Sequence, residues 1–127
     1  MKILSTFILV FFFTNLLVAQ TVLFSDTIFK NALVSDTTIN SNRDGEIQLS
    51  EALLVTSLNV SSSSITSLIG IGEFKNLRFL NCSNNALVAL DVSQLGHLDT
   101  LICNSNNLNK VCVNSRQSKL LELNPSS

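Results

Sequence analysis

The sequence predicts a short α/β solenoid: a repeat array with parallel strands on its concave face and a helical cap at its N-terminal end. Three observations predict this fold. A block of the chain repeats itself at a fixed spacing, apolar and polar residues alternate where each repeat begins, and a helix-like pattern precedes the first repeat. With 127 residues, the chain has room for one domain.

The repeat carries the pattern L-x-x-L-x-C-x-x-N-x-L, which is that of a leucine-rich repeat. A shift of 21 residues superposes equivalent positions, namely Leu77 on Leu98, Leu80 on Leu101, Cys82 on Cys103, Asn85 on Asn106 and Leu87 on Leu108. A less regular unit begins at Val55. We therefore predict about three units over residues 55–118, followed by a degenerate or truncated end over residues 119–127.

In each unit the L-x-L or L-x-C segment is predicted to be a strand whose alternate side chains face the core. The inward positions are Leu58, Val60, Leu80, Cys82, Leu101 and Cys103. Later apolar residues of each unit are expected to close the coil and fill the same core. Asn85 and Asn106 are predicted to turn the chain out of the strand and to bond backbone groups of their own and neighbouring coils. Ser63 takes that place in the first unit and can form fewer bonds.

Residues 1–19 have the layout of a secretory signal peptide, with Lys2 near the start, an apolar run over residues 3–13 and the small residue Ala19. We expect cleavage near Ala19-Gln20. An uncleaved membrane anchor is disfavoured, because a spanning helix needs about 20 apolar residues. The predicted mature chain is secreted, extracellular or at the cell surface, and has no membrane span.

Residues 20–54 are predicted to form the N-terminal cap. Residues 22–34 read as an amphipathic helix that begins at Ser25 or Asp26, both of which can accept from free backbone N–H groups. Its apolar face is expected to hold Ile28, Phe29, Ala32 and Leu33. A helix here would cover the exposed end of the first repeat.

The segment NSNRDGEIQLSE, residues 40–51, matches the spacing of an EF-hand calcium loop. Positions 1, 3, 5, 7 and 12 of that loop fall on Asn40, Asn42, Asp44, Glu46 and Glu51, with Glu46 ligating through its backbone carbonyl. Gly45 takes the sharp turn at position 6. Asn40 departs from the usual Asp and should weaken binding. The alternative is a glycine turn before a capped helix, with residues chosen for turn chemistry.

No catalytic constellation stands out, and we expect no enzyme. The one histidine, His97, has no nucleophile or carboxylate at a motif spacing, and the three cysteines lack the spacing of a zinc site. Cys82 and Cys103 are predicted to be buried thiols, and Cys112 a free or intermolecular one. Nucleic acid is not expected as a partner, because only 8 Lys and Arg are present and they form no cluster.

The outward strand positions form the predicted ligand-binding surface. They make three columns: Ser57, Phe79 and Thr100; Asn59, Asn81 and Ile102; Ser61, Ser83 and Asn104. The surface is polar and uncharged, with Phe79 and Ile102 as apolar points. Phe79 is the predicted anchor, because aromatic residues tend to dominate interfaces.

Taken together, residues 22–113 resemble a family of secreted bacterial leucine-rich-repeat proteins. The resemblance rests on FSDTIFKNALV, NSNRDGEIQLSEA, IGIGEFKNLRFLNCSNNALVALDVS and LNKVCV. It implies an extracellular or surface binding protein. Longer members often carry a C-terminal sorting domain, which does not follow Val113 here, so we expect a short or truncated member.

The predicted function is that of an exported, non-catalytic leucine-rich-repeat module that binds a protein or glycan through its concave strand face. The alternative is a calcium-stabilised structural segment, or a truncated paralogue, with no ligand of its own.

Overall fold

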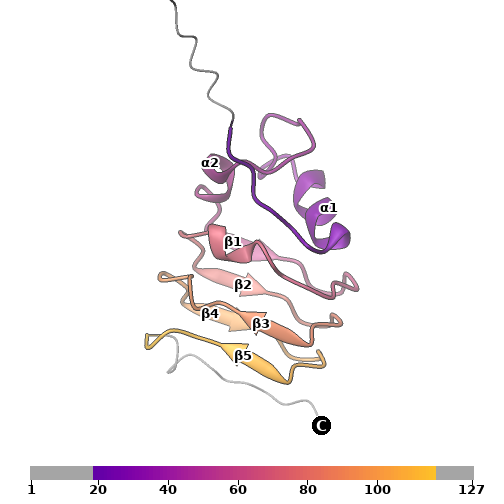
Figure 1. The fold of residues 1–127 in the computed structure, drawn as a ribbon, viewed down its shortest axis with the longest axis vertical. Coiled ribbons are helices and arrows are strands. Elements are labelled where there is room, and N and C mark those ends of the chain that lie inside the picture. Colours follow the sequence, from indigo (N-terminus) through magenta and orange to yellow (C-terminus); the bar gives the residue numbers. More distant parts are fainter. Residues whose placement is uncertain (1–18, 117–127) are drawn as a thin grey trace, which may run out of the picture.

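The computed structural model describes residues 19–116 and stacks the strands of successive repeats along the long axis of the molecule (Figure 1). Its elements follow in the order α1 (Thr27–Ser35), α2 (Leu49–Ala52), β1 (Ser57–Asn59), η1 (Ile71–Glu73), β2 (Phe79–Asn81), β3 (Ala89–Asp91), β4 (Thr100–Ile102) and β5 (Lys110–Cys112). The two α-helices lie at one end of the stack. Residues 1–18 of the predicted signal peptide, the last two residues of the predicted repeats (117–118) and the predicted degenerate end over residues 119–127 lie outside the described residues.

The predicted parallel strands are confirmed. β1 pairs with β2 and β2 pairs with β4, all parallel, in the register Ser57↔Phe79↔Thr100, Leu58↔Leu80↔Leu101 and Asn59↔Asn81↔Ile102. Each central leucine faces the core, as the alternation of a strand requires. We call the solvent side of this three-stranded sheet the β1–β2–β4 face.

A second parallel sheet was not predicted. β3 pairs with β5, with Leu90 beside Val111, in the half of each repeat that was expected only to close the coil. The repeat units thus bury apolar side chains from two sheets into one core. Leu80, Leu87 and Leu90 of the middle unit are each at most 2% exposed.

The asparagine column joins neighbouring repeats, as predicted. The Nδ2 of Asn85 donates to the carbonyls of Val60 (2.8 Å) and Cys82 (3.0 Å), and its Oδ1 accepts from the N–H groups of Ser63 (3.1 Å) and Ile65 (3.0 Å). One side chain therefore satisfies backbone groups on two levels that no strand pairing reaches.

Asn106 repeats this arrangement one level on, donating to the carbonyls of Cys82 and Cys103 and accepting from the N–H of Leu87, each at 3.0 Å. Ser63, in the equivalent place of the first unit, uses its hydroxyl to donate to the Ser61 carbonyl (3.0 Å). Its shorter side chain makes a bond within its own turn only.

The N-terminal helix is shorter than predicted. α1 begins at Thr27, because Val22 is held extended by its N–H bond to the Ile47 carbonyl (2.8 Å). Phe29 and Leu33 are buried as expected, whereas Ile28 is 44% exposed and does not belong to the apolar face. Asp26 is the N-cap, one of the two predicted residues.

Asp26 also ties the cap to the repeats. Its Oδ1 accepts from the N–H groups of Ile28 and Phe29, and its Oδ2 accepts from Thr66 N (2.7 Å), Thr66 Oγ1 (2.8 Å) and Ser67 N (3.2 Å). Burial raises the pKa of this carboxyl, but the bonds from Thr66, Phe29 and Ile28 outweigh burial and hold the pKa at about 2.

The two cysteines at equivalent repeat positions are buried free thiols, as predicted. Cys82 is fully buried and Cys103 nearly so. Burial, together with the neighbouring Cys103 thiol, raises the pKa of Cys82 to about 12, so it stays protonated at neutral pH. Both therefore act as small apolar core residues.

Among residues 19–116, no helix has the length and apolar character needed to cross a membrane.

We expect Asn85→Ala to lower the free energy of unfolding by about 2–4 kcal/mol, because it leaves several buried backbone groups of two levels without partners. Urea denaturation followed by circular dichroism would measure this. Asn107→Ala is the matched control: this asparagine is exposed in the same turn region of the next repeat, and we expect a change below about 0.5 kcal/mol. Equal losses in both variants would contradict the bridging role of Asn85.

We expect Asp26→Asn to destabilise the protein by about 1–3 kcal/mol at pH 7, because an amide has only one oxygen and cannot accept both from the start of α1 and from Thr66 and Ser67. The folded-state pKa lies below the ordinary carboxyl value of about 3.9, so the carboxylate stabilises the protein above about pH 4 and this stabilisation is lost as the pH falls toward 2. Urea denaturation at pH 7, 4 and 2.5 should show the difference between variant and parent shrinking. The exposed Asp99→Asn is the control, and a pH-independent difference for Asp26→Asn would contradict the linkage.

Candidate functional site

The β1–β2–β4 face brings together most of the predicted ligand-binding residues. The strand register places Ser57, Phe79 and Thr100 in one row and Asn59, Asn81 and Ile102 in the next. The third row continues past the strand ends, where Ser62 N donates to the Ser83 carbonyl and Asn84 N to the Asn104 carbonyl, both at 3.0 Å. The residues of the first two rows are exposed or half-buried.

Ser83 is a correction to the predicted surface. It is only 6% exposed, since its hydroxyl donates to the Oδ1 of Asn81 (2.7 Å) and its N–H to the same atom (3.1 Å). Asn59 accepts from the N–H of Ser61 in the same way (3.1 Å). The amide oxygens of this row thus hold the turns after the strands, and the Nδ2 groups are the donors that remain to contact a ligand.

The apolar points of the face are Phe79 and Ile102, which lie on neighbouring strands in adjacent rows. Both are half-buried, so each keeps an accessible part while its base packs against the sheet. A ligand that covers both would remove their apolar area from water, next to the serine, threonine and asparagine side chains of the rows.

An ion pair at the start of the strands was missed by the sequence interpretation. Arg78 Nη1 lies 2.8 Å from Asp99 Oδ2, and both side chains are 63% exposed. Arg78 directly precedes Phe79, and Asp99 directly precedes Thr100. Arg78 and Asp99 are 21 residues apart and so occupy equivalent positions in successive repeats. The repeat alignment could therefore have predicted that they lie side by side.

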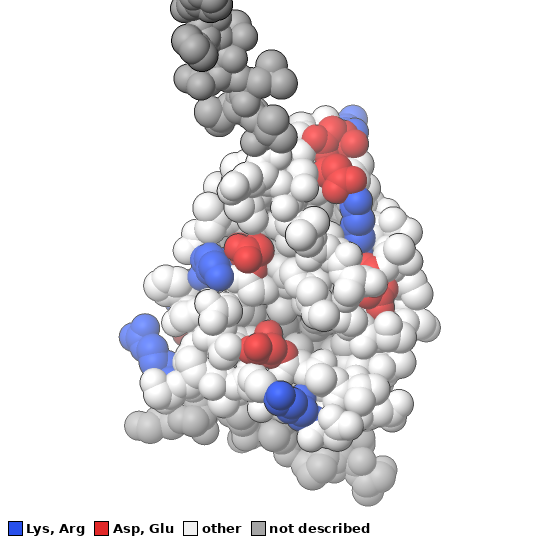
Figure 2. Space-filling model, in the orientation of Figure 1, with Lys and Arg blue, Asp and Glu red and all other residues white. Residues whose placement is uncertain are grey.

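Charges elsewhere are sparse. On the side of the molecule shown in Figure 2, Lys, Arg, Asp and Glu occur singly or in small mixed groups, and uncharged residues cover most of the surface. A ligand of this side would be bound mainly by hydrogen bonds and apolar contact, since no field of one sign extends over it.

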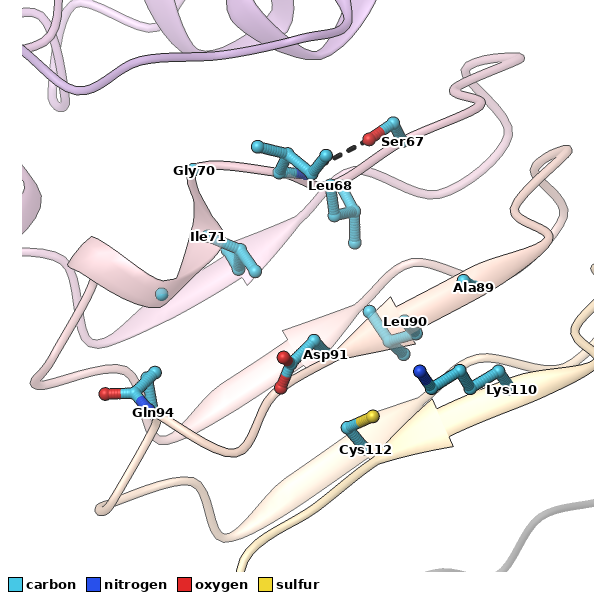
Figure 3. A pocket seen from close by; sticks show the side chains of 12 residues that line it. Ser67, Leu68, Gly70, Ile71, Ala89, Leu90, Asp91, Gln94, Lys110 and Cys112 are labelled. Atoms are coloured by element: carbon cyan, nitrogen blue, oxygen red, sulfur yellow. Dashed lines mark hydrogen bonds between the residues drawn. The ribbon is translucent and has the colours of Figure 1, made fainter.

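A pocket of about 370 Å³ lies against the second sheet and was also missed (Figure 3). Its walls come from residues 67–72 of the first unit and from β3 and β5 of the next two. Leu68, Ile71 and Leu90 form the apolar part, while Asp91 and Lys110 stand on adjacent strands at its polar side. No single repeat contains this set, so periodicity alone cannot reveal it.

The structure places the side chains of the predicted calcium loop in four different environments. Asn42 and Asp44 bond each other, Glu46 pairs with Lys30 Nζ (2.6 Å), and Glu51 folds back onto the start of the loop. Asn40 is buried beside the end of α1. Within residues 19–116, no three His, Cys, Asp or Glu side chains come together as a metal cluster.

No family model matches the chain, and no curated protein matches it. Among solved structures, the chain is similar to that of the CBM51-2 and INT domains of Clostridium perfringens ZmpB, with 27% identity and a TM-score of 0.54 over 64% of this chain and 17% of that one.

It is also similar to an internalin (inlF) from Listeria monocytogenes, with 21% identity and a TM-score of 0.55 over 69% of this chain and 29% of that one. The chain thus spans less than a third of either relative. The repeat register, the asparagine column and the likeness to an internalin together identify a leucine-rich-repeat-like fold.

Proposed function

We propose that the protein is an exported, non-catalytic binding module, a short α/β solenoid of leucine-rich repeats that contacts a protein or glycan through its β1–β2–β4 face. The observation that carries the proposal is the placement of Phe79 and Ile102 on neighbouring strands among uncharged polar rows, on a face held by parallel pairing. Export rests on the leader-like sequence of residues 1–19.

The chemistry of the face favours a neutral ligand surface. The rows offer hydroxyl groups from Ser57 and Thr100 and amide donors from Asn59 and Asn81, which suit the hydroxyl and carbonyl groups of glycans and of peptide backbones alike. Phe79 supplies a flat apolar surface for a sugar face or an apolar side chain. The Arg78–Asp99 pair adds one charge of each sign at the edge.

A non-catalytic role agrees with the residues at the face. It presents no nucleophile beside a base, and His97, which stands in the connection before the third unit, is exposed.

We expect Phe79→Ala with Ile102→Ala to weaken ligand binding at least about tenfold, because loss of a central anchor commonly costs more than 1.4 kcal/mol of binding energy. The mature chain would be screened on a glycan array and against culture-supernatant proteins. Affinity for each reproducible ligand is then measured by surface plasmon resonance, with thermal melting to confirm that the variants remain folded.

Two matched variants make the test specific. Val88→Ala removes an exposed apolar side chain away from the face and should leave affinity unchanged. Ile69→Ala alters the pocket against the second sheet. Binding that survives the Phe79 and Ile102 changes but falls with Ile69→Ala would transfer the site to the pocket and overturn the proposal. A folded chain that retains no ligand in either screen would favour the structural alternative.

A further inference from the structure

The loop over residues 40–51 contains two residues with a left-handed backbone conformation. Arg43 and Gly45 adopt positive φ angles of 58° and 84°. A Cβ on Gly45 would meet nothing within 4 Å, so glycine is needed here for conformation rather than for space. These two left-handed residues turn the chain sharply, and Asn42 and Asp44 flank Arg43 in the sequence.

Oxygen-bearing side chains converge in this turn. Asp44 Oδ2 accepts hydrogen bonds from Asn42 Nδ2 (3.1 Å) and Gln48 Nε2 (2.5 Å). Asn42 Nδ2 also donates to Gln48 Oε1 (3.0 Å). Asn42 Oδ1 and Asp44 Oδ1 accept from N–H groups two residues further on. The loop therefore holds these groups at hydrogen-bonding distance of one another.

The carboxylate of Glu51 returns to the same loop. α2 begins at Leu49, and its first turn places Glu51 so that Oε1 accepts from Ser41 N (2.8 Å) and Ser41 Oγ (2.9 Å), while Oε2 accepts from Gln48 N (3.1 Å). Burial raises the pKa of Glu51, but these hydrogen bonds outweigh burial, so its pKa lies below the ordinary value. The hydrogen bond from the Glu46 N–H likewise lowers the pKa of Asp44. Both carboxylates are therefore ionised at neutral pH.

An independent observation comes from Asn40. Its side chain is only 3% exposed, and its Nδ2 donates away from the loop to the Val34 carbonyl of α1 (3.1 Å). Because the oxygen and nitrogen of an amide point in different directions, its Oδ1 points away from the Val34 carbonyl. Among the described residues, this is the one buried side-chain oxygen or nitrogen without a hydrogen-bond partner. Such an atom is costly unless something meets it, and a cation does so directly.

We propose that residues 40–51 bind one calcium ion through side-chain oxygens of Asn40, Asn42, Asp44 and Glu51 and the backbone carbonyl of Glu46. The donors are all hard oxygens, which suits calcium and excludes soft metals. Amide and carbonyl oxygens outnumber the two carboxylates, so a count of acidic residues alone does not reveal the site. The flexible geometry of calcium tolerates such a mixed set better than the strict octahedron of magnesium.

The ion would fasten the N-terminal cap. The loop is bonded to the start of the chain through Val22 N to Ile47 O and Leu49 N to Gln20 O, both at 2.8 Å, and to α1 through the Lys30–Glu46 pair. Binding would therefore stabilise the cap that covers the first repeat. This consequence is independent of the ligand of the β1–β2–β4 face.

Calcium should raise the melting temperature of the mature protein, after removal of metal with EDTA, by about 5–10 °C at 10 mM if the site binds with the millimolar affinity of extracellular modules. Scanning calorimetry gives this shift and isothermal titration with CaCl₂ gives the stoichiometry, for which we expect one. Equal concentrations of MgCl₂ should raise the melting temperature by less than half as much.

Three variants test the ligand set. Asp44→Asn keeps the size of an exposed side chain and should reduce the calcium shift by more than half. Asn40→Asp adds a carboxylate at the partnerless oxygen and should enlarge the shift, tightening calcium binding at least about tenfold. Asp99→Asn removes an exposed carboxylate outside the loop and should leave the shift unchanged.

An unchanged melting temperature in calcium, an equal response to magnesium, or equal loss in Asp44→Asn and Asp99→Asn would overturn the proposal. Glu51→Gln is avoided as a test, because Glu51 also holds the loop in shape without any ion.

Discussion

The bridging carboxamides of Asn85 and Asn106 are the constraint on which the rest of the structure depends. Three-residue strands supply few backbone bonds, so most of each repeat is irregular chain that must find partners for its N–H and C=O groups elsewhere. An asparagine has two donors and an acceptor on a short stem, and here it serves its own level and the level before it. The spacing of the repeat is therefore fixed by hydrogen bonding as well as by leucine packing.

The burial of core side chains also depends on the neighbouring repeats. Leu80, Leu87 and Leu90 of the middle unit are almost fully buried, whereas Leu101 and Leu108 of the third unit are only half-buried. The residue types are the same, so the difference comes from the neighbours: the middle unit is covered on both sides, and the third has one described neighbour. Each level in such a stack is thus stabilised by its neighbours as well as by its own contacts.

The strands and their register could be predicted from the sequence, because a fixed offset places equivalent residues of successive units side by side. The second sheet could not, since Ala89–Asp91 and Lys110–Cys112 each carry a single strongly apolar position and show no clear alternation. The start of α1 was misplaced because Val22 pairs with Ile47, a contact that helical periodicity does not contain. Local pattern thus predicted the repeated part well and the unique cap less well.

The candidate binding face was predictable for the same reason, but its detail was not. The register gave the rows, yet only the structure shows that Ser83 bonds Asn81 and leaves the surface. The Arg78–Asp99 ion pair was predictable from the repeat alignment but was not predicted. The pocket beside β3 and β5 combines residues from three units, and no single-unit pattern encodes such a combination.

Rigidity is what a face of this composition contributes to recognition. Uncharged hydroxyl and amide groups make weak individual contacts, and each would lose side-chain freedom on binding. Here the backbone rows are already fixed by parallel pairing, and the asparagine oxygens are already held by the turns that follow the strands. Less ordering would therefore oppose the proposed binding, for which Phe79 and Ile102 are the proposed anchors. The N-terminal cap contributes to this preformed surface, because Asp26 connects α1 to Thr66 and Ser67 of the first repeat, the unit that carries the first strand of the face.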